Sequence, residues 1–470
     1  MLFRSLVKTV YSLISAGTEK FSVTTTKASL LQRAKQQPEQ FQLVIDNLKK
    51  EGILSTIEKV RSKLDSYKTL GYSSAGIVIE SKCSEFQVGN YVACGGAGLA
   101  VHSEIVAIPK NLAVKIPEGV DFQDAAYTTV GSIAIQGIRQ ADLRLGENVA
   151  VIGLGLLGQL TVQMLKASGC RVIGIDVNEG LFGKAKSFGC DATYLSNKDC
   201  VNPVKSFTNG IGCDAVIITA SANSNQPIEL AIELARKKGK VVIVGAVDMN
   251  IQRNPFYVKE LDITISCSYG PGRYDPDYED RGNDYPYAYV RWTENRNMQA
   301  VLDLLQQKKL DTKSLTSHIF PLSEASNAYQ LLTGERKEEY LGILIEYPEK
   351  KSEVIRIVKL NTSASASNIN VGFIGAGAFA QSYLLPFIKE HKVSLHTVST
   401  AKPVNAITVG KKFNFLNATT NNDEILNNSE INVVFCATLH DTHFEFVRKS
   451  LENGKAVFVE KPLEIGRAHV

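Results

Sequence analysis

Short runs of apolar residues recur along two stretches of the chain, and each run precedes a segment that carries apolar residues at helical spacing. Apolar runs of strand length are typical of strands buried on both faces, and their alternation with helices is typical of a doubly wound parallel sheet. The pattern therefore predicts two α/β regions. The predicted strands are 149–152, 171–175, 215–219, 241–244 and 262–266 in the first region, and 371–374, 394–398, 433–437 and 456–459 in the second.

The other parts of the chain mix the two kinds of pattern. Strand-like segments are predicted at 6–14, 75–80, 91–94, 103–108, 317–320 and 342–346, and helices at 296–307 and 323–333. Residues 27–66 combine apolar residues at helical spacing with many Gln, Lys and Glu residues, which predicts one or two surface helices.

A small polar stretch at 360–368 is typical of a connection between domains. The sequence thus predicts an α/β protein of several domains. The predicted boundaries are a β-rich domain at 1–145 that is completed by 271–350, an α/β domain at 146–270, a linker at 351–369 and a second α/β domain at 370–470.

Composition narrows the function classes. Of the 470 residues, 44% are hydrophobic and 21% charged, and the net charge of +4 is too small over this length to indicate a nucleic-acid or membrane-surface partner. No apolar run reaches the ~18 residues of a membrane span, and no secretory signal is recognisable. The eight cysteines form no CxxC pair, which predicts reduced thiols in a cytoplasmic protein.

A dinucleotide-binding motif opens the first α/β region. Gly153, Gly155 and Gly158 follow a predicted strand and begin a predicted helix, with Leu156 and Leu157 between the last two glycines. Such glycines permit a tight turn, a close approach of the backbone to a pyrophosphate, and close packing of helix against strand. The free N–H groups of the helix then face the phosphates.

Asp176 ends the second predicted strand of this region. A carboxylate at this position accepts hydrogen bonds from an adenosine ribose and repels a 2′-phosphate. The first region is therefore expected to bind NAD.

A second motif of the same kind opens the second α/β region, where Gly375, Gly377, Ala378 and Phe379 follow a predicted strand. The second strand of this region ends in 398–400, which contains no acidic residue. The second site is therefore expected to bind a dinucleotide, with NADP not excluded.

Residues 1–350 resemble the medium-chain dehydrogenase/reductase superfamily, which includes alcohol and sorbitol dehydrogenases. The resemblance rests on residues 15–19, 70–78, 86–92, 150–155 and 320–325. It implies a GroES-like β-rich substrate domain joined to a Rossmann domain, and an assembly into homo-oligomers.

The sequence departs from the zinc-dependent members of that superfamily. Where they carry a ligating cysteine and histidine, this chain has Ala16 and Tyr72, and the other candidates Glu19, His102 and Glu104 lack metal-like spacing. We therefore expect no zinc. Tyr72 is then a candidate to polarise a substrate carbonyl or to manage the hydroxyl proton, with ordinary strand packing as the alternative.

A second catalytic candidate follows the last strand of the first region. Arg273 lies in the segment 268–274, at the sheet edge where ligands bind in such folds, and could hold a substrate carboxylate or phosphate. Stacking residues of a sugar site could be Trp292 and the alternating Tyr285, Tyr287 and Tyr289, although packing of a helix or strand is the commoner explanation for such residues.

Residues 370–470 resemble the N-terminal half of the Gfo/Idh/MocA oxidoreductases. The resemblance rests on residues 371–377, 434–438 and 456–463 together with His440 and His443. It implies that Lys461 faces the nicotinamide and a sugar hydroxyl as a catalytic residue, and that Thr438, His440 and Glu460 line the cofactor site. That family's substrate domain would follow Lys461, and the first strand of the medium-chain dehydrogenases would precede Leu6. We therefore expect a chain that is truncated at both ends and a second module that binds a dinucleotide without turning over a sugar.

These observations favour an NAD(P)-dependent oxidoreductase that transfers hydride without zinc on a sugar, a sugar nucleotide or a related alcohol or carbonyl, in bacterial polysaccharide biosynthesis. Two alternatives stay open: an enoyl or quinone reductase, and a non-catalytic dinucleotide-binding sensor or scaffold.

Overall fold

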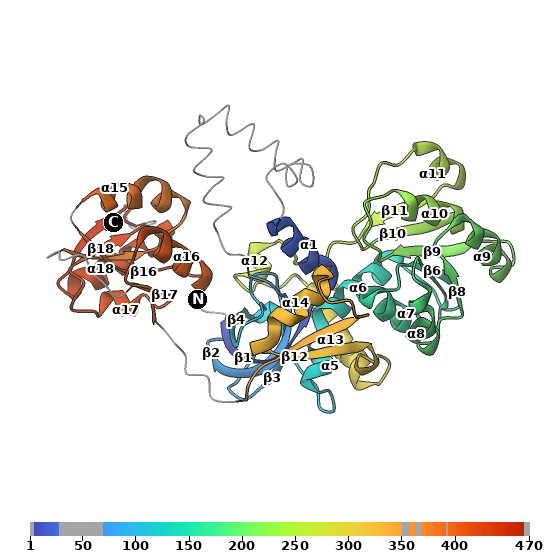
Figure 1. Ribbon diagram of the computed structural model, residues 1–470, viewed down its shortest axis with the longest axis horizontal. Helices are drawn as coiled ribbons and strands as arrows, with labels where there is room; N and C mark the ends of the chain where they lie inside the picture. Colours follow the sequence, from blue (N-terminus) through green and yellow to red (C-terminus); the bar gives the residue numbers. More distant parts are fainter. Residues whose placement is uncertain (1–3, 28–68, 350–356, 362–368, 392, 465–470) are drawn as a thin grey trace. The chain divides into compact units, whose positions relative to one another are not determined.

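The computed structural model describes residues 4–27, 69–349, 357–361, 369–391 and 393–464. The chain forms two compact units (Figure 1). Of the described residues, unit 1 takes in 4–27 and 70–349, and unit 2 takes in 69, 357–361, 369–391 and 393–464. Among the described residues, no helix has the length and apolar character needed to cross a membrane.

The first sheet of unit 1 has seven strands in the order β12-β13-β1-β2-β3-β5, with β4 paired to β1. All of its pairings are antiparallel except that of β12 with β13. Buried and half-buried residues alternate along the first part of β1, as expected for a strand with one face on the core. The strands are β1 (Arg4–Ile14), β2 (Ser73–Ser81), β3 (Tyr91–Gly95), β4 (Ile105–Pro109), β5 (Ala113–Lys115), β12 (Thr316–Pro321) and β13 (Gly342–Glu346).

The second sheet of unit 1 is parallel, with the order β11-β10-β9-β6-β7-β8 that defines a dinucleotide-binding doubly wound fold. Its apolar runs are explained by burial on both faces: Ala150 and Ile152 pack in one core and Val149 and Val151 in the other. The strands are β6 (Asn148–Ile152), β7 (Arg171–Asp176), β8 (Ala192–Leu195), β9 (Cys213–Ile218), β10 (Ala235–Ile243) and β11 (Asp262–Ile265).

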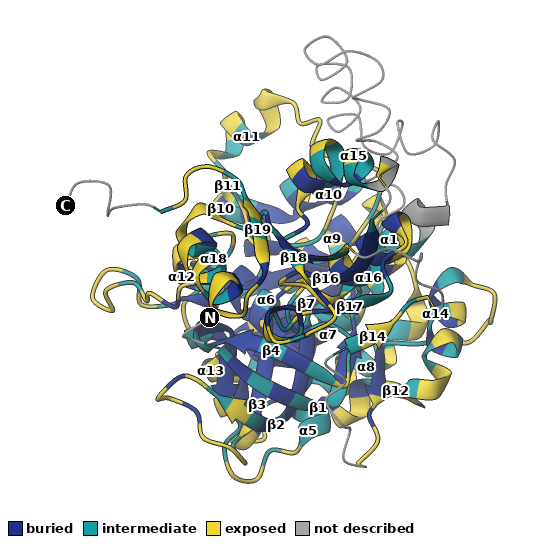
Figure 2. Cartoon of the chain, turned by 90° about the vertical axis from the view of Figure 1, so that its left-hand side faces the viewer, coloured by how far each residue is buried: buried dark blue, intermediate teal, exposed yellow. Residues whose placement is uncertain are grey.

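The helices of unit 1 cover these sheets (Figure 2), and α11, which has no buried residue, projects from the surface. The α-helices are α1 (Ala16–Lys27), α5 (Phe122–Ala125), α6 (Thr128–Ala141), α7 (Leu156–Ala167), α8 (Phe182–Ser187), α9 (Val201–Phe207), α10 (Gln226–Leu234), α11 (Arg253–Lys259), α12 (Pro276–Glu279), α13 (Glu294–Gln306) and α14 (Ala325–Thr333). The 3₁₀ turns are η1 (Lys110–Leu112), η2 (Glu179–Leu181), η3 (Lys198–Cys200), η4 (Lys313–Leu315) and η5 (Leu322–Glu324).

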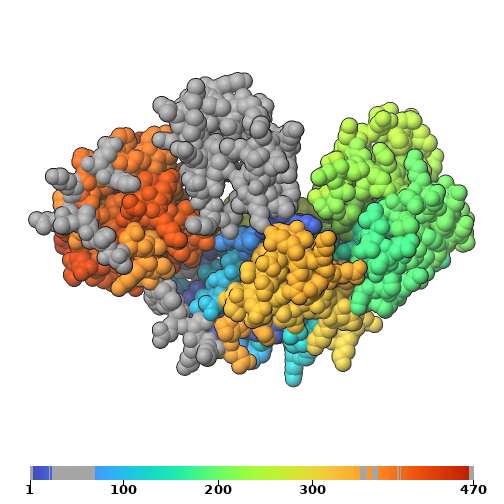
Figure 3. Space-filling model, viewed as in Figure 1, coloured from blue at the N-terminus to red at the C-terminus, as the bar shows by residue number. Residues whose placement is uncertain are grey.

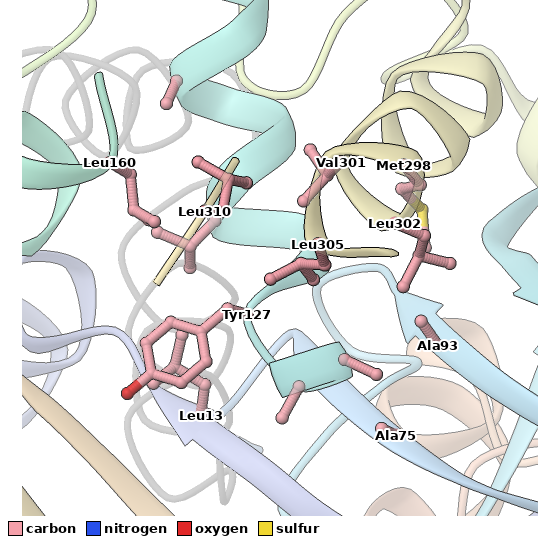
Figure 4. Packing of buried hydrophobic residues seen from close by; sticks show 14 of the residues in the cluster. Leu13, Ala75, Ala93, Tyr127, Leu160, Met298, Val301, Leu302, Leu305 and Leu310 are labelled. Carbon is pink, nitrogen blue, oxygen red and sulfur yellow. The ribbon is translucent and has the colours of Figure 1, made fainter. Parts of the chain in front are cut away.

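One core joins the two sheets of unit 1 through α13 (Figure 4). Four residues of α13 lie on one helical face, because they recur at intervals of three and four positions. They pack with Leu13 and Ala75 from the first sheet and with Leu160 from α7. The four residues are Met298, Val301, Leu302 and Leu305.

The segment that follows β11 therefore closes onto both sheets of unit 1. Figure 3 shows its orange surface in front of the blue atoms of the N-terminal strands.

Unit 2 contains one six-stranded sheet in the order β14-β17-β16-β15-β18-β19. Its strands are β14 (Ile357–Lys359), β15 (Asn370–Ile374), β16 (Ser394–Ser399), β17 (Asn417–Thr419), β18 (Val433–Cys436) and β19 (Ala456–Val459), of which all but β14 are parallel. Its helices are the π-helix η6 (Ala380–Leu384), α15 (Leu385–Glu390), α16 (Pro403–Phe413), α17 (Asp423–Leu426), the 3₁₀ turn η7 (His440–Thr442) and α18 (His443–Glu452).

The α/β fold class predicted from the sequence is confirmed, and the predicted strands of both α/β regions are present within a few residues of their expected bounds. The range 351–369 differs from the expected linker, because its described residues Ile357–Lys359 pair with β17. This short strand forms the edge of the sheet of unit 2. The helices expected at 27–66 lie, apart from residue 27, outside the described residues.

Candidate cofactor and active sites

The first glycine loop has the geometry that its motif predicts. Gly153 has a φ of +100°, and a Cβ there would lie 2.6 Å from the backbone nitrogen of Ala220. A Cβ on Gly158 would lie 1.9 Å from the carbonyl oxygen of Gly153. Around the Cβ position of Gly155, which precedes α7, no atom lies within 4 Å. The first and third glycines are therefore fixed by packing, and the second borders open space at a helix N-terminus, where a pyrophosphate would fit.

Asp176 stands at the end of β7 beside this loop. Its Oδ2 accepts a hydrogen bond from Leu154 N at 2.6 Å, and its Oδ1 accepts one from Asn178 N at 2.8 Å. The carboxylate is half-buried, and each oxygen has a further lone pair. Asp176 thus stabilises the loop, and its carboxylate can still accept hydrogen bonds from ribose hydroxyls. Leu156 and Leu157, in the first turn of α7, pack against the core of unit 1.

The second glycine loop repeats this arrangement in unit 2. Gly375 has a φ of +83°, and its Cβ would lie 2.6 Å from the carbonyl oxygen of Ala437. No atom lies within 4 Å of the Cβ position of Gly377, and the next residues, Ala378 and Phe379, are exposed. At the end of β16, Ser399 is buried and donates to Asn422 Oδ1 at 2.6 Å. No carboxylate takes the place that Asp176 has in unit 1.

The residues predicted around the second site come together at one sheet edge, because β18 and β19 are parallel neighbours. The buried side chain of His443 bridges the two strand ends: its Nδ1 lies 2.8 Å from the Pro462 carbonyl and its Nε2 3.2 Å from the Thr438 carbonyl. Lys461 is exposed and Glu460 is half-buried on the turn held in this way, and His440 is exposed. The bridge through His443 depends on three-dimensional proximity, so the sequence motif did not predict it.

In unit 1, the position that carries a zinc-ligating histidine in the resembled superfamily holds Tyr72. Its hydroxyl donates to Ser15 Oγ at 2.6 Å, and burial, followed by the charge of Glu19, raises its pKa. The Ser15 hydroxyl in turn points to Thr18 Oγ1 at 3.5 Å, and Thr18 is exposed. A chain of three hydroxyls therefore leads from Tyr72 to the surface.

Glu19 forms the centre of a buried polar network beside this chain. Its carboxylate accepts hydrogen bonds from Ser15 N at 2.9 Å and Tyr329 Oη at 2.6 Å, and lies 3.1 Å from His102 Nε2. The other ring nitrogen of His102 contacts Ser12 Oγ at 2.7 Å. Glu19 and His102 are far apart in sequence, and sequence spacing gave no sign that they would meet.

These residues do not fit a zinc ion. Ala16 supplies no ligand, the Tyr72 phenol is kept protonated by its surroundings, and the Glu19 carboxylate is already occupied by protein donors. Within the described ranges, no group of three or more His, Cys, Asp or Glu side chains is gathered in a way that would hold a metal.

Arg273 lies in the interior of unit 1. Its guanidinium donates to Glu279 Oε1 at 2.5 Å and stacks on the Tyr274 ring, 4.0 Å from the centroid. Both partners of this ion pair are largely buried, with side-chain exposures of 13% and 14%. One arm of the guanidinium fork is therefore already used by the protein, whereas Arg273 Nε has no hydrogen-bond partner among the described residues.

Glu294 lies next to this ion pair and was not anticipated. The residue is fully buried, and neither carboxyl oxygen has a hydrogen-bond partner within the described part of the chain. Burial, followed by the charge of Glu279 and opposed by that of Arg273, raises the pKa of Glu294 to about 9. Near neutral pH the group is therefore a neutral carboxylic acid.

Comparison with known proteins supports two modules of different origin. Residues 157–280 match the family model of the zinc-binding dehydrogenases, and residues 369–469 match that of the oxidoreductase family with an NAD-binding Rossmann fold (Gfo/Idh/MocA). The chain therefore contains two dinucleotide-binding regions, each similar to a different oxidoreductase family.

Two curated relatives each match part of the chain. Alcohol dehydrogenase 1 of Emericella nidulans is 34% identical over 169 residues, which cover 35% of this chain and 48% of that protein. An uncharacterized zinc-type alcohol dehydrogenase-like protein of Escherichia coli (strain K12) is 24% identical over 240 residues, covering 50% of this chain and 61% of that protein. The chain thus spans about half of the length of the first relative and about three fifths of the second.

Solved structures agree on the fold. An alcohol dehydrogenase from Thermus sp. ATN1 superposes with a TM-score of 0.53 at 19% identity, covering 74% of this chain and 93% of that one. Galactitol-1-phosphate dehydrogenase from Escherichia coli gives a TM-score of 0.53 at 17% identity with the same coverage. The chain therefore shares its fold with these dehydrogenases over about three quarters of its length.

Proposed function

We propose that the protein is an NAD(P)-dependent oxidoreductase in which unit 1 binds NAD(H) and transfers hydride without zinc. The first glycine loop with Asp176 beside it carries this proposal, because it combines an open helix N-terminus for the pyrophosphate with an acceptor for the ribose. The substrate would be a sugar, a sugar nucleotide or a related alcohol or carbonyl compound, in carbohydrate metabolism.

Tyr72 is the proposed proton donor of unit 1. A dinucleotide held by the first glycine loop and Asp176 would supply the hydride for reduction of a carbonyl carbon. As the carbonyl double bond opens, Tyr72 transfers its hydroxyl proton to the carbonyl oxygen, and Ser15 returns a proton to the phenolate from the surface through Thr18. A raised pKa suits this role because the phenol is protonated before the reaction.

Glu19 and His102 would position the donor. A Cβ on Gly71 would lie 2.9 Å from three atoms of the His102 ring, so the imidazole packs directly against the backbone that carries Tyr72. Glu19 in turn fixes both Ser15 and His102. The network takes the place of a metal site as the rigid support of the reacting group.

Unit 2 is proposed to bind a second dinucleotide at Gly375 and Gly377, with Lys461 towards the nicotinamide. The bridge through His443 supports this, because it places the Lys461 turn beside the Thr438 turn.

A fluorescence titration with NADH and NADPH tests both sites. Gly155→Val and Gly377→Val each put a side chain into space that no protein atom occupies, so folding should be kept while one site is lost in each variant. Gly183→Val is the matched control, since Gly183 in α8 also has no atom within 4 Å of its Cβ position. Equal stoichiometry in wild type and Gly155→Val would contradict the proposal.

Two outcomes would favour the alternatives. A preference of unit 1 for NADPH, against the expectation from Asp176, would favour an enoyl or quinone reductase. Two-site binding without turnover on a panel of sugars, sugar nucleotides and alcohols would favour a sensor or scaffold.

A further inference from the structure

Five side chains of unit 1 form a continuous pile of cations and rings, called here the arginine–aromatic stack. The guanidinium carbons of Arg139 and Arg291 lie over the Trp292 ring, 3.3 and 3.7 Å from its centroid. Arg291 and Arg296 lie over the Tyr287 ring, at 4.8 and 4.7 Å. Arginines therefore cover the rings of Trp292 and Tyr287, which the sequence suggested as candidates for stacking on a sugar.

The stack carries more positive charge than the protein neutralises. Arg296 is paired with Asp284 and also donates to the Val290 carbonyl at 2.5 Å. Arg139 donates its Nε to the neutral amide oxygen of Asn297 at 2.8 Å. Across the described residues, neither Arg139 nor Arg291 forms an ion pair, so two positive charges are left without a carboxylate.

The proximity of these positive charges affects the pKa of Arg139. Burial, followed by the charge of Arg291, lowers the pKa of Arg139 to about 10. Cation–ring contacts are weak attractions, so the rings offset part of the repulsion between the arginines without removing the charge.

The stack adjoins the presumed substrate region of unit 1. Arg139 lies near the end of α6, and its partner Asn297 donates its side-chain amide to the Tyr269 carbonyl at 2.9 Å. Tyr269 belongs to the segment that follows β11, at the carboxyl end of the Rossmann sheet, where ligands bind in such folds.

We propose that the arginine–aromatic stack is a binding site for a phosphate dianion carried by the substrate. Stacking occupies the flat face of a guanidinium and leaves its N–H groups at the edge, in the fork geometry that matches phosphate oxygens. The two positive charges of Arg139 and Arg291 would be neutralised by the two negative charges of a phosphate monoester or a nucleotide-sugar diphosphate. A single carboxylate would neutralise only one of them. The use of the site in catalysis rests on the proposed function, but the binding itself does not.

Trp292 makes the test specific, because it is the only tryptophan of the 470 residues. Its fluorescence emission is titrated with inorganic phosphate and with glucose 6-phosphate at constant ionic strength. Sodium chloride is the control for a non-specific anion, and glucose is the uncharged control. A saturable change with both phosphates, absent with chloride and glucose, is expected. Arg291→Gln should weaken phosphate binding at least about tenfold, since one charge-assisted hydrogen-bonding group is lost.

Two controls separate the site from general effects. Arg281→Gln removes an exposed arginine of the same chain segment that is paired with Asp277, and should leave the affinity unchanged. Trp292→Phe should abolish the emission change while phosphate still raises the melting temperature, because binding to the folded state stabilises it.

Each contrary result overturns the inference. The first is a Trp292 emission change that rises linearly and equally with phosphate and chloride, and the second is an unchanged phosphate affinity in Arg291→Gln. The third is displacement of bound phosphate by NADPH but not by glucose 6-phosphate, which would assign the anion site to the cofactor. Phosphate binding that persists in Gly155→Val would show that the anion site does not depend on the cofactor site. Saturable phosphate binding by a wild-type protein that turns over no substrate would sustain the site and count against the proposed function alone.

Discussion

The two glycine loops of this chain have nearly the same backbone and differ in what surrounds them. In unit 1, the loop is tied to the carboxylate of Asp176, and the third glycine is indispensable to the packing of α7. In unit 2, the corresponding strand ends in a buried serine, and Ala380 takes the third position at the start of a π-helix. The shared turn therefore indicates dinucleotide binding, whereas its neighbours decide selectivity and tolerance to substitution.

The third position of the motif gives the largest expected difference. In Gly158→Ala, the new Cβ would meet the Gly153 carbonyl oxygen at 1.9 Å, so strand and helix must separate. We expect unit 1 to lose about 3 kcal/mol of stability, measured by denaturant unfolding. Gly183→Ala serves as the control, and an unchanged unfolding midpoint in Gly158→Ala would show that the loop is looser than described.

The second largest difference between the two units is expected for their candidate catalytic residues, Tyr72 in unit 1 and Lys461 in unit 2. Tyr72→Phe removes only the hydroxyl and should lower kcat of unit 1 about a hundredfold, as expected for loss of a general acid. Lys461→Ala in unit 2 should leave that activity unchanged. Equal kcat values for Tyr72→Phe and wild type on a carbonyl substrate would rule out the proposed proton donor.

The Glu294 carboxyl group in unit 1 and the Glu445 carboxyl group in unit 2 should contribute to the pH dependence of stability with opposite sign. The pKa of Glu294 rises from 4.5 in the unfolded chain to about 9, so the folded state binds the extra proton between these values and unit 1 loses stability as pH rises. The slope is at most about 1.4 kcal/mol per pH unit. Glu294→Gln should flatten it, as judged by urea unfolding at pH 6 and pH 8.

Glu445 in unit 2 provides the reference. Its pairing with Lys449 lowers its pKa, so its contribution is present at neutral pH and is lost as pH falls. Because the pKa of Glu445 lies below its ordinary value of 4.5, the Glu445→Gln variant is compared with wild type at about pH 3 and pH 5. If Glu445→Gln and Glu294→Gln changed the slope of stability against pH in the same direction, the assignment of Glu294 as a neutral acid would be wrong.

The smallest expected effect concerns cofactor choice. Asp176→Asn keeps an acceptor for Leu154 N but removes the charge, so the ratio of NADPH to NADH dissociation constants in unit 1 should fall about tenfold. Fluorescence titration in a Gly377→Val background isolates this site. A ratio that does not change would mean that Asp176 serves only the turn.

The sequence predicted what depends on local pattern. Continuous apolar runs located the strands of both parallel sheets, and the glycine motifs located the two loops. The short strands β8 and β17 were not predicted, because three or four residues of mixed polarity show no periodic pattern. The contacts of Glu19 with His102 and of Arg139 with Trp292 were beyond reach, since they arise only when distant segments fold together.

The short strand β14 has a practical consequence for anyone who wishes to study unit 2 alone. Ile357–Lys359 lies along the outer side of β17, so it occupies backbone groups that would otherwise face water. A fragment that starts at Asn370 would uncover this edge, which could then pair with the same edge of another molecule and aggregate. The excised domain should therefore begin ahead of Ile357, even though the glycine motif starts well after it.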